Sequence, residues 1–219
     1  MNNILGAVIS GVTAFAATNL DDLFLLMLYF SRANNNPQRE GSIILGQYLG
    51  FSVLVFISVL GYLGSLLIPR HYVGLLGILP ILLGIRELLS FWQADEQDGP
   101  QVAANAKTAT PSGIFRSRLL RWLNPQASSV AVVTVANGSD NLAVYTPLFA
   151  AGGTRPMVII IVVLLLMVRV WCFIADWLAE NPVTAGPLRR YGKLLMPFVL
   201  MGIGLTILIE SGALELFVP

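Results

Sequence analysis

The sequence is poor in charged side chains. Only 11% of its 219 residues are Asp, Glu, Lys or Arg, whereas a soluble domain usually carries about a quarter. A folded surface in water and a disordered chain both need more polar side chains than this, and a nucleic-acid binder needs a clearly basic field, against a net charge of +1 here. The composition argues against a soluble enzyme, a disordered protein and a nucleic-acid-binding protein.

Cysteine and histidine are also scarce. The chain has one cysteine, Cys172, and one histidine, His71. A single cysteine cannot close a disulfide within the chain, and a zinc cluster of thiolates needs several. An intramembrane enzyme that works through a cysteine pair, or through a nucleophile beside a base, lacks the residues it needs. We therefore expect neither an enzyme nor a bound cofactor.

What the sequence has in abundance is apolar residues. They make up 56% of the chain and give it a mean hydropathy of +0.75. A helix needs roughly 20 mostly apolar residues to cross a lipid bilayer. Six runs approach or exceed this length: 4–30, 43–68, 72–92, 127–151, 157–178 and 194–214. The predicted fold class is an all-α polytopic membrane protein with six transmembrane helices. Its surface is predicted to contact membrane lipid.

The residues between these apolar runs predict how the chain is divided into repeats and a linker. No basic residue precedes the first run, so we interpret it as a retained span and not as a secretory signal. Residues 93–126 are predicted to form a cytoplasmic linker that includes an amphipathic segment at 114–122. The linker separates a first three-helix repeat, residues 1–92, from a second, residues 127–219.

Basic residues predict the orientation. The loops after the first, third and fifth runs hold nine Lys and Arg residues, whereas the other side holds only Arg70 and Arg155. Short loops rich in Lys and Arg stay in the cytoplasm. Both chain termini are therefore predicted on the non-cytoplasmic side.

The two halves resemble each other. A shift of 119 residues lays Ala17, Asp21, Leu23 and Phe30 on Ala136, Asp140, Leu142 and Phe149, and lays Asp22 on Asn141. Because each half has three spans, the halves would enter the membrane in opposite directions. Inverted repeats of this kind are typical of secondary transporters, whose substrate binds near the midplane where the repeats meet.

Polar residues lie in the middle of the first and fourth runs. A charge at the bilayer centre costs on the order of 2.5–3.5 kcal/mol, and a bound cation would offset that cost. Helical spacing places carboxylate and amide oxygens on one face of each run, as a hard divalent ion requires. The predicted metal ligands are Asp21, Asp22, Asp140, Asn19, Asn137 and Asn141. The alternative is that the acids cap broken helices or pair with Arg169.

Four further residues could take part in ion binding or proton coupling, and three of them also have a structural interpretation. Thr18 and Gln47 could add an oxygen to the site, although Gln47 could equally hydrogen-bond a neighbouring helix. Cys172 could be a soft ligand or a small packing residue. Arg169 could pair with a site acid when the metal is absent, and so take part in proton coupling with Asp21, Asp22 and Asp140, or it could form a plain structural ion pair.

Several segments resemble the CadD-type cadmium resistance transporter family of the lysine-exporter (LysE) superfamily. They are residues 19–23 (NLDDL), 46–51 (GQYLGF), 75–85 (LLGILPILLGI) and 135–150 (VANGSDNLAVYTPLFA), together with Trp171-Cys172 and residues 196–198 (MPF). The resemblance implies a transporter of the bacterial cytoplasmic (inner) membrane that lowers internal Cd²⁺ and is driven by the proton gradient.

Chemistry leaves rival functions open. Cd²⁺ is soft and prefers sulfur, whereas carboxylate and amide oxygens suit Mn²⁺ or Ca²⁺. A cation exchanger for these harder ions, an amino-acid exporter of the same superfamily and a purely structural assembly factor therefore remain alternatives. The sequence leaves the oligomeric state open, a homo-oligomer included.

Overall fold

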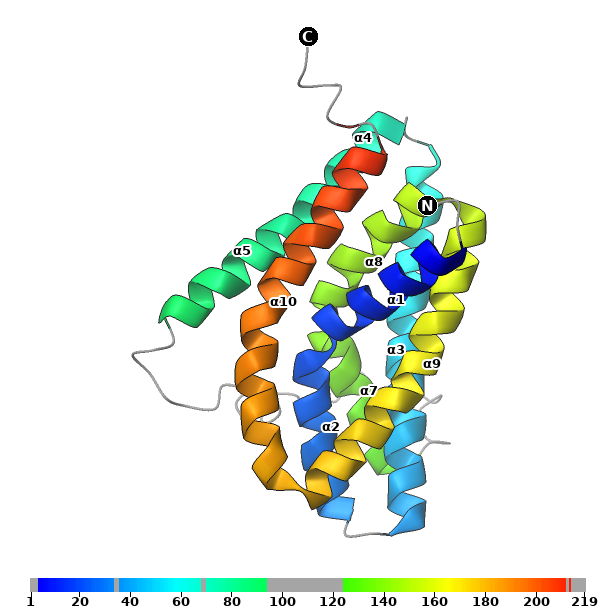
Figure 1. Cartoon of the computed structure of the whole chain (residues 1–219). Coiled ribbons are helices and arrows are strands. Elements are labelled where there is room, and N and C mark those ends of the chain that lie inside the picture. Colours follow the sequence, from blue (N-terminus) through cyan, green and yellow to red (C-terminus); the bar gives the residue numbers. More distant parts are fainter. Residues whose placement is uncertain (1–3, 34–35, 68–69, 94–123, 212, 214–219) are drawn as a thin grey trace.

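The computed structural model describes residues 4–33, 36–67, 70–93, 124–211 and 213 (Figure 1). Every regular element within these ranges is a helix, which confirms the all-α class. Most of the predicted linker, residues 94–123, lies outside the described residues, and so does the amphipathic segment. The division into 1–92, 93–126 and 127–219 stays a prediction.

The first half of the chain folds into six helical elements. They are α1 (Ile4–Thr18), α2 (Leu20–Ala33), α3 (Pro37–Ser65), α4 (Arg70–Gly74), η1 (Leu75–Gly77) and α5 (Ile78–Gln93). The start of α3 follows from the sequence, because the Asn36 side chain accepts hydrogen bonds from the first-turn amides and Pro37 needs no amide partner there.

The second half contains α7 (Pro125–Asn137), α8 (Ser139–Gly152), α9 (Thr154–Glu180) and α10 (Pro182–Glu210). An Asn-Pro pair again opens the half, since the Asn124 side chain accepts from the Gln126 amide. Gly153 separates α8 from α9 with a φ of 77°, a backbone conformation that glycine adopts at no steric cost.

Among the described residues, three helices are long and apolar enough to cross a membrane by themselves: Pro37–Ser65, Tyr72–Leu89 and Thr154–Glu180. The pair α1 and α2 makes a fourth span if its two helices, bent by 63°, are counted together. The chain is therefore a multi-pass membrane protein. The other two predicted spans are helical, but α7 and α8 are interrupted at Gly138 and the apolar part of α10, Leu194–Glu210, is short. Six spans stay a prediction.

Helices of each half pack against helices of the other half. Helix α3 runs along α7 and α8 of the second half, whereas α9 runs along α1 and α2 of the first half, and α5 lies along α10 (Figure 1). The middle helix of each half thus covers the interrupted helix of the other half. This reciprocal packing of α3 and α9 is compatible with the predicted inverted repeat.

Both interruptions lie where the sequence places its polar residues. The first is at Asn19, between α1 and α2, and the second is at Gly138, between α7 and α8. These two positions coincide when the halves are aligned by their acids. At each break the following helix begins with an acid in its first turn, Asp21 and Asp22 in α2 and Asp140 in α8.

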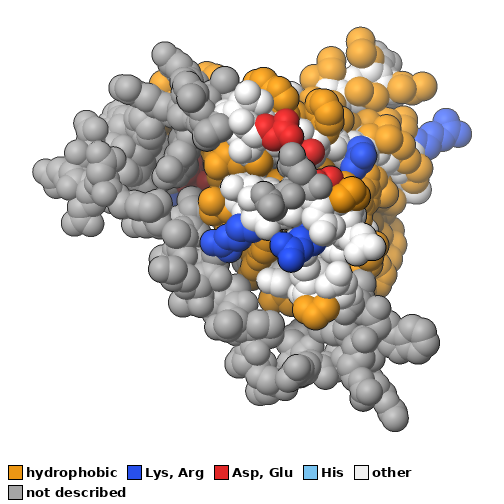
Figure 2. All heavy atoms as spheres, turned by 90° about the horizontal axis from the view of Figure 1, so that it is seen from below, with side chains coloured by type: hydrophobic (Ala, Val, Ile, Leu, Met, Phe, Trp, Pro, Cys, Tyr) orange, Lys and Arg blue, Asp and Glu red, His pale blue; other side chains and the backbone are white. Residues whose placement is uncertain are grey.

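The outer surface suits lipid. Large apolar side chains are exposed along α3, α5, α9 and α10, among them Phe56, Leu82, Leu166 and Phe198. The lower end in Figure 1, where α2 and α9 end and α3 begins, carries exposed Arg32, Arg39 and Glu180. Figure 2 looks onto this end and shows charged side chains near its centre and hydrophobic ones around them.

Candidate metal site at the helix breaks

Asn19 joins the two halves at the first break. Its side chain is 0% exposed, and its amide nitrogen lies 3.1 Å from Asn141 Oδ1 and 2.8 Å from the Tyr145 hydroxyl, both in α8. The same nitrogen is 2.9 Å from Thr18 Oγ1. The structure therefore brings together three of the predicted ligands, Asn19, Asn141 and Thr18.

Asp22 lies one turn further along α2 and is also buried, at 5% exposure. Gln47 of α3 donates from Nε2 to Asp22 Oδ2 over 3.3 Å. Asn137 of α7 donates from Nδ2 to Asp22 Oδ1 over 3.5 Å. One carboxylate thus stands between carboxamides from both halves of the chain, and these residues are predicted ligands as well.

Two glycines on α3 explain how Gln47 reaches this place. A Cβ at Gly46 would collide with the carbonyl oxygen of Ala127, and one at Gly50 would lie 2.7 Å from that of Ala131 and 2.8 Å from Thr134 Cβ. Small residues four apart let two membrane helices approach closely. The close approach of α3 and α7 sets Gln47 directly beside Thr134, whose hydroxyl lies 2.6 Å from Gln47 Oε1.

Asp21 and Asp140 lie outside this buried network. Asp21 is exposed and Asp140 half-buried, and they interact electrostatically with each other. Arg86 of α5 is a further charge acting on Asp140. In the described part of the chain no three His, Cys, Asp or Glu side chains lie close enough to hold one metal ion. The structure thus brings Asp22 to the amides and leaves Asp21 and Asp140 at the edge.

Sequence reasoning missed Tyr145, Trp171 and Thr134. The Tyr145 hydroxyl contacts Thr18 Oγ1 at 2.9 Å, and Trp171 of α9 donates from Nε1 to the Asn19 carbonyl over 2.8 Å. Spacing held a signal for two of them. Thr134 stands three residues before Asn137 and Tyr145 four after Asn141, so each shares a helix face with a predicted ligand. Trp171 carried no such signal, because it lies on another helix.

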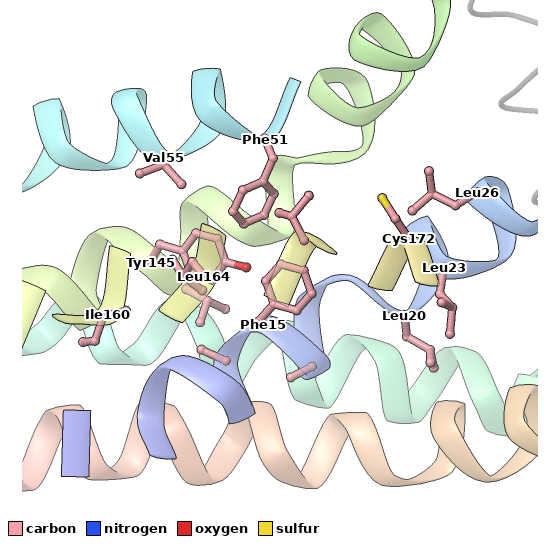
Figure 3. Packing of buried hydrophobic residues seen from close by; sticks show 14 of the residues in the cluster. Phe15, Leu20, Leu23, Leu26, Phe51, Val55, Tyr145, Ile160, Leu164 and Cys172 are labelled. Carbon is pink, nitrogen blue, oxygen red and sulfur yellow. The ribbon is translucent and has the colours of Figure 1, made fainter. Parts of the chain in front are cut away.

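Aromatic rings fill the space on the upper side of the break. The rings of Phe15 and Phe51 are 5.3 Å apart, those of Phe51 and Tyr145 6.0 Å, and those of Tyr145 and Phe149 6.3 Å. Figure 3 shows Phe15, Phe51 and Tyr145 converging from α1, α3 and α8. Phe15, Phe51, Tyr145 and Phe149 are called the aromatic cluster below, and each is 0% exposed.

The lower side of Asp22 is different. A cavity of about 10 Å³ lies there, lined by Asp22, Leu25, Leu26, Tyr29, Gln47, Val130, Val133 and Thr134. This is about the space that one water molecule needs. Below it the Tyr29 and Ser129 hydroxyls lie 3.2 Å apart and link α2 to α7.

Cys172 and Arg169 belong to another place. Both line a separate hollow of about 100 Å³ together with Glu40 and Asp176. No predicted oxygen ligand lines this hollow. Cys172 itself is 1% exposed and packs against the hydrophobic core. The structure therefore does not bring the thiol or Arg169 to the carboxamides around Asp22.

Comparison with known proteins gives one result. Neither the curated proteins nor the solved structures include a significant match to this chain. Residues 15–219, which include both helix breaks and all the residues described above, match the sequence model of a family described as cadmium resistance transporter. The chain belongs to the cadmium resistance transporter family.

Proposed function

We propose that this protein exports Cd²⁺ and related divalent ions across the bacterial inner membrane in exchange for protons, from a site at the two helix breaks. The observation that carries the proposal is Asp22, a buried carboxylate held between Gln47 and Asn137, with no cationic side chain among its hydrogen-bond partners in the described part of the chain. A charge in that position is costly without a partner, and a divalent ion supplies one.

The proposed ligands are carboxylate and amide oxygens. Asp22, Asn19, Asn137 and Asn141 form the inner part of the site, with Thr18 and Gln47 at its margin. Asp21 and Asp140 at its edge would attract the ion and join it when the halves move. In this proposal the chain has six spans in two inverted repeats, with both termini on the non-cytoplasmic side, so that the lower end in Figure 1 faces the cytoplasm.

Proton exchange follows from competition for the same oxygens. A carboxylate must lose its proton before it binds a metal ion, and a proton that returns weakens the bond to the metal. Ion entry from the cytoplasm would release protons from Asp21, Asp22 and Asp140, and proton uptake from outside would release the ion. Such competition is sufficient for antiport. Metal affinity is therefore expected to fall as pH falls.

The decisive experiment is transport into inside-out vesicles. Wild-type protein should accumulate Cd²⁺ when the vesicle interior is acidic, and Asp22→Asn or Asp140→Asn should abolish that accumulation while the protein still inserts. Asp176→Asn, which removes a carboxylate beside the separate hollow, is the matched control and should transport normally. Full Cd²⁺ transport by Asp22→Asn would refute the proposed site.

A second candidate is an exchanger for Mn²⁺ or Ca²⁺. It is favoured by the donors around Asp22, which are all oxygen and nitrogen atoms, whereas the Cys172 thiol lies in another hollow. Hard ions prefer oxygen and soft ions prefer sulfur. Titration of the purified protein with Cd²⁺, Zn²⁺, Mn²⁺ and Ca²⁺ separates the two candidates by the order of the affinities.

A further inference from the structure

The Thr134 hydroxyl lies within hydrogen-bonding distance of two acceptors. Its hydroxyl oxygen lies 2.6 Å from Gln47 Oε1 and 3.0 Å from the Val130 carbonyl oxygen. A hydroxyl has one hydrogen to donate but can also accept. When Thr134 donates its hydrogen to Gln47, its hydrogen bond to the Val130 carbonyl is weakened. When it donates to Val130 instead, its oxygen can accept a hydrogen bond from Gln47.

Gln47 lies between Thr134 and Asp22 and has these two hydrogen-bond partners. At 2% exposure it is shut off from solvent, so its amide must find both partners inside the protein. Its nitrogen now faces the Asp22 carboxylate and its oxygen faces Thr134. This orientation is the one expected without an ion, because an N–H donor compensates the negative carboxylate.

An ion next to Asp22 reverses the requirement. Gln47 Nε2 lies 3.3 Å from Asp22 Oδ2, so an ion held by this carboxylate would meet the Gln47 amide. Its N–H group would then point at a positive charge. The two ends of a carboxamide are nearly the same size, and a half-turn about the last side-chain bond exchanges them.

We propose that Gln47 turns its amide when the ion binds, and that Thr134 is the positioning residue that permits this turn. In the ion-bound state Gln47 Oε1 faces the ion, Gln47 Nε2 donates to the Thr134 hydroxyl, and Thr134 donates to the Val130 carbonyl. Each buried polar group keeps a partner in both states. The inference rests on the proposed ion site at Asp22 and adds Thr134 to it.

The experiment measures Cd²⁺ affinity of the full-length protein in detergent by isothermal titration. Thr134→Val keeps the side-chain volume but removes the hydroxyl, and it should weaken Cd²⁺ binding about five- to tenfold, the value of one lost hydrogen bond. Thr134→Ser restores a hydroxyl and should stay within about twofold of wild type. Thr206→Val is the matched control, because Thr206 is exposed on α10 and bonds only its own helix.

A double-mutant cycle separates positioning from a direct role. Gln47→Leu should itself weaken binding, and Thr134→Val should then cost nothing more, because Thr134 acts through Gln47. If Thr134→Val loses the same factor with and without Gln47, Thr134 is a ligand and the turn is refuted. If Thr134→Val binds Cd²⁺ as the wild type does, the inference is equally wrong.

Two further readouts keep the test decisive. Cd²⁺ should raise the melting temperature of Thr134→Val less than that of wild type, whereas a merely structural defect would lower both temperatures and leave the Cd²⁺-induced rise unchanged. Asp22→Asn is measured alongside. If Asp22→Asn loses Cd²⁺ binding and Thr134→Val keeps it, the site stands and only the turn fails; if both keep it, the proposed site fails.

Discussion

The two sides of the buried carboxamide network are built differently. On the upper side the four rings of the aromatic cluster pack between α1, α3 and α8, and every ring is shielded from solvent. On the lower side a water-sized cavity reaches Asp22, and the Tyr29 and Ser129 hydroxyls link α2 to α7 below it.

The lower side should open at a smaller cost in free energy than the upper side. Opening the upper side separates several rings, each with many van der Waals contacts, whereas α2 and α7 on the lower side are already separated in part by the small cavity and are linked there by the Tyr29 to Ser129 hydrogen bond. Such bonds are worth about 0.6 kcal/mol in membrane proteins. The structure therefore resembles a state closed firmly above Asp22 and lightly below it.

Phe51→Ala should destabilise the protein most. Phe51 contacts the rings of both Phe15 and Tyr145, so its loss leaves a cavity between α1, α3 and α8. We expect a loss of about 3 kcal/mol in unfolding free energy, the low end for a buried aromatic residue because lipid supplies little hydrophobic gain. Denaturation in mixed micelles measures it. Phe56→Ala on the same helix, 62% exposed, is the control and should change little.

Gly50→Ala should have the next largest effect, at the contact between α3 and α7. The added methyl group would lie 2.7 Å from the Ala131 carbonyl oxygen, so α3 and α7 must move apart. Overpacking of this kind costs about 2 kcal/mol, and the Gln47 to Thr134 contact should lengthen. The same unfolding assay applies. Gly64→Ala on α3, where a Cβ meets nothing within 4 Å, should be tolerated; equal losses in the two variants would contradict the close-approach argument.

Tyr145→Phe should cost less, because it keeps the ring and removes only the hydroxyl. That hydroxyl serves both Thr18 and Asn19. We expect a loss of about 1 kcal/mol in unfolding free energy, with a weaker Cd²⁺ affinity because Asn19 is no longer held against α8. A Tyr145→Phe protein with normal stability and normal affinity would show that the aromatic cluster closes the upper side without positioning the site.

The contrast also shows what the sequence could reveal. The buried acid Asp22, the amides Asn19 and Asn141, and the helical class follow from rules about charge and apolar length that hold inside one segment. The partners that hold them do not. Trp171 reaches Asn19 from a helix some 150 residues later, and no spacing rule predicts which helices of a bundle become neighbours.

The sequence predicts that Asp21, Asp22 and Asp140 contribute to one metal site, and this part of the prediction had the least support from spacing. Alignment of the halves placed Asp21 opposite Asp140 and Asp22 opposite Asn141, which says that these pairs are equivalent but not that all four side chains point to one centre. The rotation of α2 decides that question: Asp22 faces α3 and α7, whereas its neighbour Asp21 faces outward. Adjacent residues on a helix point about 100° apart, so Asp21 and Asp22 face different surroundings.

Tyr29→Phe should have the smallest effect on stability and yet the clearest effect on access. It removes the hydrogen bond to the Ser129 hydroxyl, worth about 0.6 kcal/mol, so the lower side should open about threefold more often.

Thiol labelling measures this opening. Leu25→Cys, in a Cys172→Ala background, places one cysteine at the wall of the small cavity. When Tyr29→Phe is added, this cysteine should react about threefold faster with a membrane-impermeant thiol reagent applied at the lower end. Ser129→Ala should have the same effect, and the two changes together should do no more than either alone, because they break one bond. If instead Phe51→Cys, with the reagent added at the opposite end, reacted faster than Leu25→Cys, the upper side would be the lightly closed one, and the contrast between the two sides would be reversed.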